Sequence, residues 1–318
     1  MSHQLKIGIS ISLIVVVSIV LLFMLKKDNN YTKKNELKMT ERNSFDMNTK
    51  TVLLNNGEKM PILGLGTWQL TGNVAENSVY VAIKNGYRLI DKAYWYGNEE
   101  DVGRAVRKAI NDGLVTREEL FITTKLPPYG FDDYEKAIDD CNKRLGLDYI
   151  DLMLVHQSGS DEKKLYRAIE NKIKTGIVKS LGISNYYTKK DFEEVVKDAK
   201  IMPAVIQNEN HIFYNDREFY EYVSQYGIVI ESYYPFGGRG HTKDSLGNEV
   251  ISNIAKKYNK TSAQIILRWH IQSGFITIPG SSNEEHIKEN YDIFDFELTS
   301  EEISTINNLN TGKRYENW

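Results

Sequence analysis

The sequence contains one cysteine, Cys141, and only six prolines among its 318 residues. A single cysteine excludes an internal disulfide and any zinc or iron–sulfur site built from several cysteines of one chain, and we expect no metal centre. The few prolines exclude a long proline-rich linker. The chain is not poor in apolar residues either: 41% are hydrophobic and 26% are charged, which is typical of a globular protein and excludes a disordered chain.

The main part of the chain also lacks an excess of basic residues. Residues 1–50 carry 8 Lys or Arg and 4 Asp or Glu, whereas residues 51–318 carry the remaining 32 and 39. Affinity for nucleic acids comes largely from basic side chains that neutralise phosphates. We therefore expect no nucleic-acid partner for this acidic body.

One long run has no charged residue at all. Residues 7–25 are 19 residues without Asp, Glu, Lys, Arg, Asn, Gln or Pro. As a helix they would span about 28 Å, close to the hydrocarbon thickness of a bilayer. A cleaved signal peptide is the alternative, but Lys26 and Lys27 follow the run in place of small residues. We expect a retained membrane anchor over residues 1–27 and a flexible linker over residues 28–50.

The basic residues around this run are distributed unequally. Lys6 alone precedes it, whereas six basic residues follow it within residues 26–42. The positive-inside rule places such a basic flank in the cytoplasm. We therefore expect a single-pass membrane protein whose C-terminal body faces the cytoplasm.

From residue 51 onward, short apolar runs alternate with amphipathic stretches. Eight runs are typical of buried parallel strands: residues 62–65, 88–91, 120–125, 150–155, 178–183, 204–207, 228–232 and 275–279. The stretches between them include residues 77–84, 100–111, 133–144, 162–174, 190–200, 216–225 and 262–272. Eight strand–helix repeats predict an α/β fold, a closed (β/α)₈ TIM barrel over residues 51–318.

A hairpin signal precedes the first of these strands. Asn55–Gly57 separates apolar runs at residues 52–54 and 60–63, and we expect an N-terminal β-hairpin that plugs the bottom of the barrel. A doubly wound dinucleotide-binding fold is the competing architecture. Its fingerprint is incomplete, because Gly64–Gly66 is followed by Thr-Trp-Gln and no third glycine.

Polar residues stand where several predicted strands end, which is the reactive face of such a barrel. Asp91 ends the second strand, Lys125 ends the third, and His156 follows the fourth. Tyr96 lies five residues beyond Asp91. Each has an ordinary structural explanation by itself, as a helix cap, a solvated lysine or a hydrogen-bonded histidine. Their occurrence on three consecutive strands indicates a site.

These side-chain types suit protonation of a carbonyl oxygen. A nearby ammonium lowers the pKa of a tyrosine, a carboxylate keeps that ammonium charged, and a neutral histidine orients the substrate oxygen. The hydride that completes a carbonyl reduction comes from no side chain, and a nicotinamide cofactor is its natural donor. Ser184, Asn185 and Gln207 are candidates to hold the carboxamide of the cofactor, and Tyr233 is a candidate to stack on its ring.

Several segments closely resemble motifs of the aldo-keto reductase family. They are residues 86–99, 122–125, 148–156, 182–185 and 278–290. The resemblance covers residues 51–318 and is greatest to bacterial members that reduce glyoxal-type aldehydes or diketo sugar acids. It implies a monomeric enzyme that reduces aldehydes and ketones to alcohols with NAD(P)H.

The resemblance also implies a role for individual residues. Tyr96 is the expected proton donor, Lys125 lowers its pKa and Asp91 pairs with Lys125. His156 orients the substrate, and the expected substrate-binding residues are Trp68, Tyr96 and His156. The expected cofactor-binding residues are Gly66, Thr67, Trp68, Asp91, Ser184, Asn185, Gln207, Tyr233, Phe236, Gly237, Ser281, His286 and Asn290.

Four positions depart from the family pattern. Lys92 replaces the usual Thr after the catalytic Asp, which adds a positive charge near the site. Gln157 and Ser158 replace a Trp-Pro pair, which removes an aromatic wall from the substrate pocket. Gly280 and His286 replace the Lys and Arg that normally grip the extra phosphate of NADPH. NADPH is the expected cofactor, with NADH as the alternative.

Other functions fit parts of the pattern. The predicted anchor is compatible with a catalytically weak, nicotinamide-sensing accessory subunit of a membrane partner. A barrel isomerase or lyase for phosphorylated substrates is a third hypothesis, although it needs no residues to hold a carboxamide. The Gly237–Gly240 segment fits a phosphate cradle, a loop that folds over the cofactor and a plain turn equally well.

Overall fold

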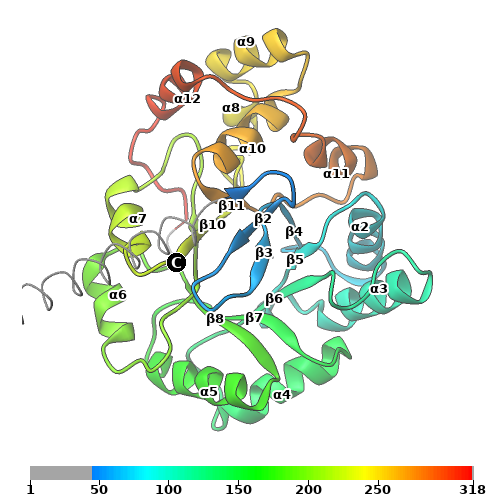
Figure 1. Cartoon of the computed structure of the whole chain (residues 1–318), viewed down its shortest axis with the longest axis vertical. Coiled ribbons are helices and arrows are strands. Elements are labelled where there is room, and N and C mark those ends of the chain that lie inside the picture. The colour runs from blue at the N-terminus through cyan, green and yellow to red at the C-terminus, as the bar shows by residue number, and fades with distance from the viewer. Residues whose placement is uncertain (1–44, 317–318) are drawn as a thin grey trace, which may run out of the picture. The chain divides into compact units, whose positions relative to one another are not determined.

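Eight parallel strands form the centre of the molecule, and helices surround them (Figure 1). The computed structural model describes residues 45–316. The strands are β4 (Gly64–Gly66), β5 (Leu89–Asp91), β6 (Phe121–Leu126), β7 (Ile150–Val155), β8 (Val178–Ser184), β9 (Val205–Glu209), β10 (Val229–Tyr233) and β11 (Phe275–Thr277). They pair in sequence order, and a parallel bridge between Leu63 and Thr277 joins the two ends. The predicted (β/α)₈ barrel is therefore confirmed.

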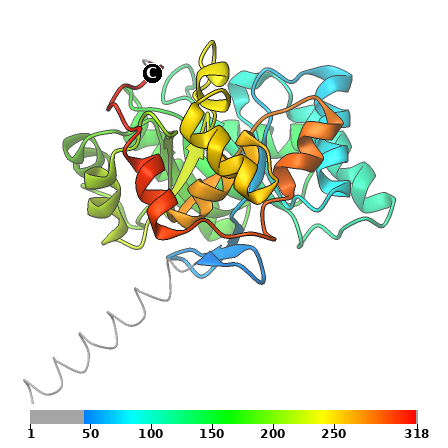
Figure 2. The same ribbon diagram turned by 90° about the horizontal axis from the view of Figure 1, so that it is seen from above.

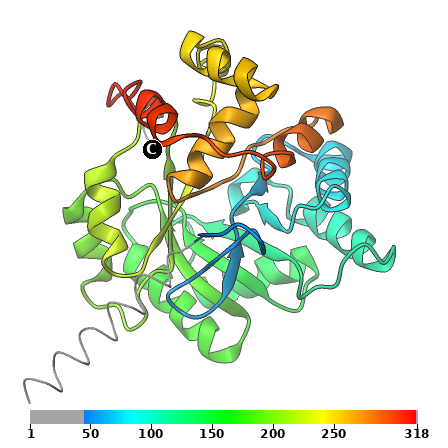
Figure 3. The same ribbon diagram turned by 45° about the horizontal axis from the view of Figure 1, so that its top comes forward.

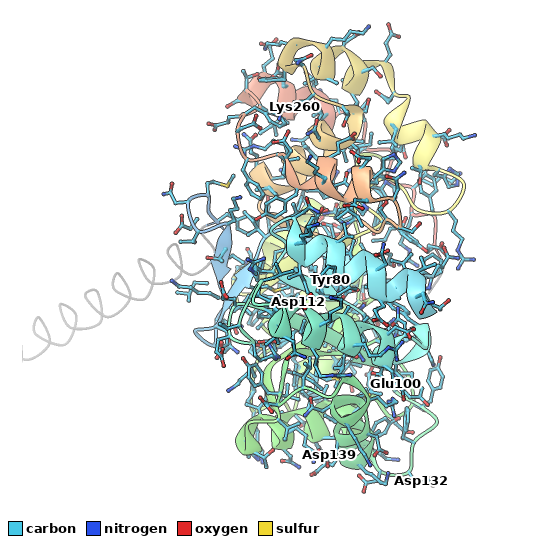
Figure 4. All side chains as sticks on the ribbon, turned by 90° about the vertical axis from the view of Figure 1, so that its right-hand side faces the viewer. Tyr80, Glu100, Asp112, Asp132, Asp139 and Lys260 are labelled. Atoms are coloured by element: carbon cyan, nitrogen blue, oxygen red, sulfur yellow. The ribbon has the colours of Figure 1, made fainter. Side chains whose placement is uncertain are left out.

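The helices follow the strands and pack outside the barrel. They are α2 (Gly72–Lys84), η1 (Tyr94–Tyr96), α3 (Glu99–Asn111), α4 (Tyr134–Leu145), α5 (Glu162–Thr175), α6 (Lys189–Val196), α7 (Arg217–Ser224), α8 (Thr242–Leu246), α9 (Glu249–Tyr258), α10 (Ser262–Gln272), α11 (Glu284–Tyr291) and α12 (Ser300–Asn307). Their outer faces carry polar side chains, as at Tyr80, which donates a hydrogen bond of 2.7 Å to Asp112 (Figure 4). Their inner faces bury apolar residues against the strands.

Local sequence explains where these helices begin and end. The Asp133 side chain accepts the backbone N–H of Lys136 and so caps the start of α4. Gly146 ends the same helix at a φ of 63°, in the left-handed region that glycine adopts without strain. Thr261 and Gln264 form a reciprocal capping box at the start of α10.

A second apolar cluster is formed mainly by residues of α9, α10 and α12. Figure 3 shows these helices (yellow, orange and red) on one side of the barrel. The buried members of the cluster include Ile251, Ile265, Trp269 and Ile306. The Trp269 indole N–H donates to the side chain of Asn307 at 2.9 Å, which ties α10 to α12. This cluster supports the segment between β10 and β11, the strands that border one side of the cavity described below.

The predicted hairpin is also present. Strands β2 (Thr51–Leu53) and β3 (Lys59–Pro61) pair antiparallel, and β1 (Phe45–Asp46) adds a third strand inside the segment expected to be linker. The Asn56 side chain donates to Ser180 Oγ near the start of β8 at 2.9 Å. Figure 2 shows the hairpin (blue) at one end of the barrel. The hairpin thus covers the amino-terminal end of the strands.

The predicted membrane anchor requires a correction. Within residues 45–316, no helix is long and apolar enough to cross a membrane. The run on which the prediction was based, residues 7–25, lies outside the described residues. A hydrophobic run of sufficient length is compatible with a spanning helix but does not establish one. The single-pass architecture, the membrane partner and the cytoplasm-facing topology are therefore not retained.

Candidate active site

The four predicted catalytic residues converge at the carboxyl ends of adjacent strands. Asp91 ends β5, Lys125 lies near the end of β6, and His156 directly follows β7. The short helix η1 carries Tyr96, and it stops at Gly97, whose φ of 63° turns the chain towards α3. The parallel pairing of β5, β6 and β7 therefore brings side chains that are distant in sequence to one end of the barrel.

Lys125 is the centre of this group. Its ammonium lies 2.6 Å from Asp91 Oδ1 and 3.2 Å from the Tyr96 hydroxyl oxygen, and it donates to the backbone carbonyl of Lys92 at 3.1 Å. An ammonium has three N–H groups, so each one has an acceptor. Lys125 is fully buried, which fixes its position relative to the Tyr96 phenol.

The pKa of Tyr96 is raised overall, whereas the prediction considered only the lowering effect of Lys125. Burial raises the pKa of Tyr96, and the Lys125 ammonium opposes this increase without cancelling it. Burial by itself lowers the pKa of Lys125, but the Asp91 carboxylate and the Tyr96 phenol raise it by more. Lys125 therefore stays charged, and Tyr96 keeps its proton at neutral pH, as a proton donor must.

His156 stands beside this group as a neutral imidazole. Burial and then the Lys125 charge hold the pKa of His156 well below its ordinary value. Its ring lies 4.8 Å from the Trp95 ring and 6.1 Å from the Tyr96 ring, measured between centroids. Its Nδ1 is buried and has no hydrogen-bond partner among residues 45–316. The His156 side chain also lines the cavity described next.

A cavity of about 630 Å³ opens above these residues. Most residues predicted from the sequence line it: Gly66, Trp68, Asp91, Tyr96, His156, Ser184, Asn185, Gln207, Tyr233, Phe236 and Ser281. Four predicted cofactor residues are not part of the lining: Thr67, Gly237, His286 and Asn290. Thr67 is buried and its hydroxyl donates to the Asp91 carbonyl at 2.9 Å, so it supports the backbone of the site instead.

Hydrogen bonds hold the polar wall of the cavity in a defined geometry. The Tyr233 hydroxyl donates to Asn185 Oδ1 at 2.7 Å, and Asn185 Nδ2 donates to the His156 carbonyl at 2.9 Å. Asn185 has a φ of 62°, a left-handed conformation that Asn tolerates better than most residues. This network connects the ends of β7, β8 and β10 and presents amide and hydroxyl groups to the cavity.

The sequence also matches a known family. Residues 62–311 match the model of the Aldo/keto reductase family. The chain belongs to this family. The resemblance noted from the motifs is therefore confirmed.

Comparison with individual proteins gives the same family. Glyoxal reductase of Bacillus subtilis is 44% identical over 268 residues, which cover 83% of this chain and 94% of the relative. NAD(P)H-dependent D-xylose reductase of Candida tropicalis is 36% identical over 304 residues, with coverage of 83% and 94%. A Bombyx mori aldo-keto reductase, solved in complex with NADP, is 34% identical with a TM-score of 0.77 and coverage of 83% and 94%.

The protein is thus an NAD(P)H-dependent oxidoreductase that reduces carbonyl groups and uses a nicotinamide cofactor. The alternative of a catalytically weak accessory subunit is not favoured. Residues of this aldo/keto reductase fit such a cofactor chemically. Ser184, Asn185 and Gln207 place hydroxyl and amide groups along one wall of the cavity, and the Tyr233 ring stands beside them.

Lys92, which departs from the family pattern, does not enter this cavity. Its side chain is fully buried and pairs with Glu99 of α3, which also pairs with Arg144 of α4. The charge that Lys92 was expected to add near the site is thus paired with Glu99 outside the cavity. A residue just beyond a strand end turns towards either the barrel or the helices, and here it turns towards the helices. Only its backbone carbonyl reaches the site, as an acceptor for Lys125.

Four further residues at the site were not predicted. Trp95 and Tyr234 line the cavity, and the Arg239 guanidinium lies 4.2 Å from the centre of the Trp68 ring. Arg239 belongs to the Gly-rich segment for which three interpretations were open. Glu231 lies buried beneath the cavity in β10. Its signal in the sequence is a charged residue in the middle of an apolar run.

Proposed function

We propose that Tyr96 is the proton donor of the reaction, that Lys125 and Asp91 control its charge, and that His156 orients the substrate carbonyl. The observation that carries this proposal is the position of the Lys125 ammonium, 2.6 Å from Asp91 and 3.2 Å from the Tyr96 oxygen. These groups meet in a cavity that also contains His156.

The chemistry divides between the cofactor and the protein. A reduced nicotinamide, when bound, supplies the hydride that adds to the carbonyl carbon. As negative charge develops on the carbonyl oxygen, Tyr96 transfers its proton to that oxygen and becomes a phenolate. The Lys125 ammonium stabilises the phenolate, and Asp91 keeps Lys125 charged and aimed. The neutral His156 donates a hydrogen bond that fixes the oxygen within reach of Tyr96.

The test of these roles is Tyr96→Phe in the full-length protein. We expect kcat/KM for an aldehyde to fall by about 10² to 10⁴-fold, since only the acid group is removed. Binding of NADPH, followed by protein fluorescence, should stay within about threefold of wild type. Tyr94→Phe is the matched control, because Tyr94 lies on the same short helix but packs against Phe131 outside the catalytic group. Near wild-type turnover by Tyr96→Phe would refute the proposed mechanism.

For the substrate, we propose small dicarbonyl aldehydes of the glyoxal type. The support is the 44% identity to a glyoxal reductase and the presence of Gln157, a polar residue, in the cavity lining. A second carbonyl oxygen would find a hydrogen-bond donor in the Gln157 amide. Consumption of NADPH measured with glyoxal, methylglyoxal, benzaldehyde and D-xylose tests this. A kcat/KM for D-xylose above that for both dicarbonyls would contradict it.

For the cofactor, we propose that the protein prefers NADPH to NADH, but by a smaller factor than a family member that has the usual Lys and Arg. The support is the NADP complex of the Bombyx mori relative, against the absence of the usual Lys and Arg at Gly280 and His286. Gly280 has no side chain to offer a phosphate, and His286 is an exposed side chain on α11. Separate kcat/KM values for NADPH and NADH test this, and a higher value with NADH would contradict the preference.

A further inference from the structure

Glu231 is a buried carboxyl group that the mechanism above does not use. It lies in the middle of β10, where its register partners are Gln207 on β9 and Ile276 on β11. Its side chain is fully buried inside the barrel. A carboxyl group in such a position is costly unless it keeps its proton or has strong partners, so its presence beside the catalytic group calls for a physical reason.

Gln207 connects Glu231 to the catalytic group. The Gln207 side-chain nitrogen, Nε2, lies 2.8 Å from Asp91 Oδ2 and 2.7 Å from Glu231 Oε2. A primary amide has two N–H groups, and here each one has a carboxyl oxygen as its acceptor. Asp91 is the ionised partner of Lys125 and can only accept hydrogen bonds. The amide nitrogen must therefore face the two carboxyl groups, which leaves the amide oxygen of Gln207 as its free polar atom.

Gln207 also lines the cavity, so the direction of this oxygen matters to a bound cofactor. A carboxamide has an NH₂ group, which needs an acceptor. The Gln207 amide oxygen, held towards the cavity, supplies this acceptor. If the Gln207 amide were rotated by half a turn, its own NH₂ group would face the NH₂ group of the cofactor. Asp91 accepts at 2.8 Å and favours this orientation, and Glu231 Oε2 adds to it as a second acceptor for the same nitrogen at 2.7 Å.

The titratable groups that face Glu231 come from three elements. They are Asp91 on β5, Lys125 on β6 and the Tyr96 phenol on η1, while Gln207 on β9 is neutral. Burial, and then the Asp91 carboxylate, raise the pKa of Glu231 to about 8. Its second oxygen, Oε1, has no hydrogen-bond partner within residues 45–316. Glu231 is thus a neutral acid near pH 7 and gains a charge in mildly alkaline solution.

We propose that Glu231 is a positioning residue of this reductase, which helps to keep the Gln207 amide oxygen towards the cofactor carboxamide. Ionisation of Glu231 would add a second negative charge beside the Asp91–Lys125–Tyr96 group and weaken it. The inference rests on the proposed role of Tyr96. A second negative charge inside the barrel draws the Lys125 ammonium away from the phenol and disfavours the phenolate that proton transfer creates. The alkaline loss therefore affects kcat, whereas loss of the Gln207 orientation affects cofactor affinity.

Two variants of the full-length protein separate these effects. We expect kcat of the wild type to fall as pH rises through about 8. Glu231→Gln keeps an acceptor for Gln207 but cannot ionise, and it should lack this fall. Glu231→Leu removes the acceptor, and the Kd for NADPH near pH 7 should rise about tenfold. Glu231→Gln should restore most of that affinity. Glu170→Gln is the matched control, because Glu170 is also a buried carboxyl group but lies on α5, where it accepts the N–H groups of Lys200 and Ile201.

A cofactor analogue distinguishes orientation from general damage. The 3-acetylpyridine analogue of NADP has a methyl group where the carboxamide has its NH₂. Wild type should bind the authentic cofactor in preference to the analogue, and Glu231→Leu should lose most of this preference. A merely structural role of Glu231 would weaken both ligands equally.

Infrared spectroscopy of the wild type measures the protonation of Glu231 directly, so this test does not depend on whether a variant folds. The carbonyl band of a protonated carboxyl group should disappear as pH rises through about 8, and the band should be missing from Glu231→Gln. An alkaline fall in kcat that persists unchanged in Glu231→Gln, or an unaltered preference between the two cofactors in Glu231→Leu, would overturn the inference. Activity of Tyr96→Phe would instead overturn the proposed function, so the two failures are distinguishable.

Discussion

Lys92 and Lys125 are both fully buried and stand on neighbouring segments of the barrel, yet they face opposite sides of it. Lys125 points into the barrel, where it meets Asp91 and Tyr96. Lys92 points outward to Glu99 on α3. One lysine therefore belongs to the chemical site, and the other belongs to the layer between strands and helices.

Their partners explain why the two pKa values move in opposite directions. Burial lowers the pKa of Lys92 by more than Glu99 raises it, and the nearby Arg144 charge lowers it slightly further. Burial acts on Lys125 in the same sense, but Asp91 and Tyr96 outweigh it. Burial alone therefore does not decide the charge of an enclosed lysine. What decides it is the balance between burial and the charged or polar groups around the ammonium.

The largest expected effect is loss of activity in Lys125→Met. Without the ammonium the phenolate of Tyr96 has no counter-charge, so kcat/KM should fall by about 10² to 10⁴-fold. Steady-state reduction of an aldehyde measures this, with circular dichroism to confirm folding. Lys92→Met is the control, since it removes a buried lysine from the other side of the strands. Equal losses of kcat/KM in both variants would show that the contrast between them is wrong.

A smaller effect is expected on the stability of Lys92→Met. Removing one partner of a buried ion pair costs about 3 kcal/mol, and Arg144 remains on Glu99 to limit the loss. The free energy of unfolding from denaturant titration measures this, and kcat/KM of the folded enzyme should stay within about threefold of wild type. The double variant Lys92→Met with Glu99→Leu should recover part of the lost stability, because the buried carboxylate is removed and the partly exposed Arg144 keeps contact with water. No difference between single and double variants would contradict this account.

The smallest effect is the dependence of stability on alkaline pH. The pKa of Lys92 is lower in the folded chain than its ordinary value of 10.5, so between these two values the unfolded chain binds more protons. The free energy of unfolding should therefore rise with pH in wild type relative to Lys92→Met, by at most about 1.4 kcal/mol per pH unit. The raised pKa of Lys125 acts in the opposite sense, since its stabilisation is present below 10.5 and is lost above it.

Denaturant titrations at a series of pH values up to about 10 would measure this difference. The sign is the decisive result. A free energy of unfolding that falls with pH in wild type relative to Lys92→Met would mean that Lys92 has a raised pKa, and the contrast with Lys125 would disappear.

The sequence was sufficient to predict the barrel because its signals are repeated and local. All eight predicted strands exist, and their limits differ by a residue or two. The first one shows why: Leu63 is buried in the predicted run but forms only an isolated bridge to Thr277, and the strand itself starts at Gly64. Asp91, Lys125, His156 and Tyr96 were predictable because the end of a barrel strand has a known position in space.

Other features depend on three-dimensional surroundings that no local pattern contains. The outward direction of Lys92 follows from the position of Glu99 on the next helix, and the raised pKa of Tyr96 follows from burial that outweighs Lys125. His286, predicted from its place in a motif, lies outside the cavity lining. The membrane prediction used an apolar run and its basic flanks, and these residues lie outside the described part of the chain.

The hairpin at the amino-terminal end of the barrel determines the route by which the reactants reach the cavity. Because that end is covered, both reactants reach the cavity from the carboxyl-terminal end. Ser184 and Gln207 are almost completely enclosed, whereas Trp95 is 43% exposed at the rim. A molecule that contacts the enclosed residues therefore lies deeper than one held at the rim, and both pass through the same opening during turnover.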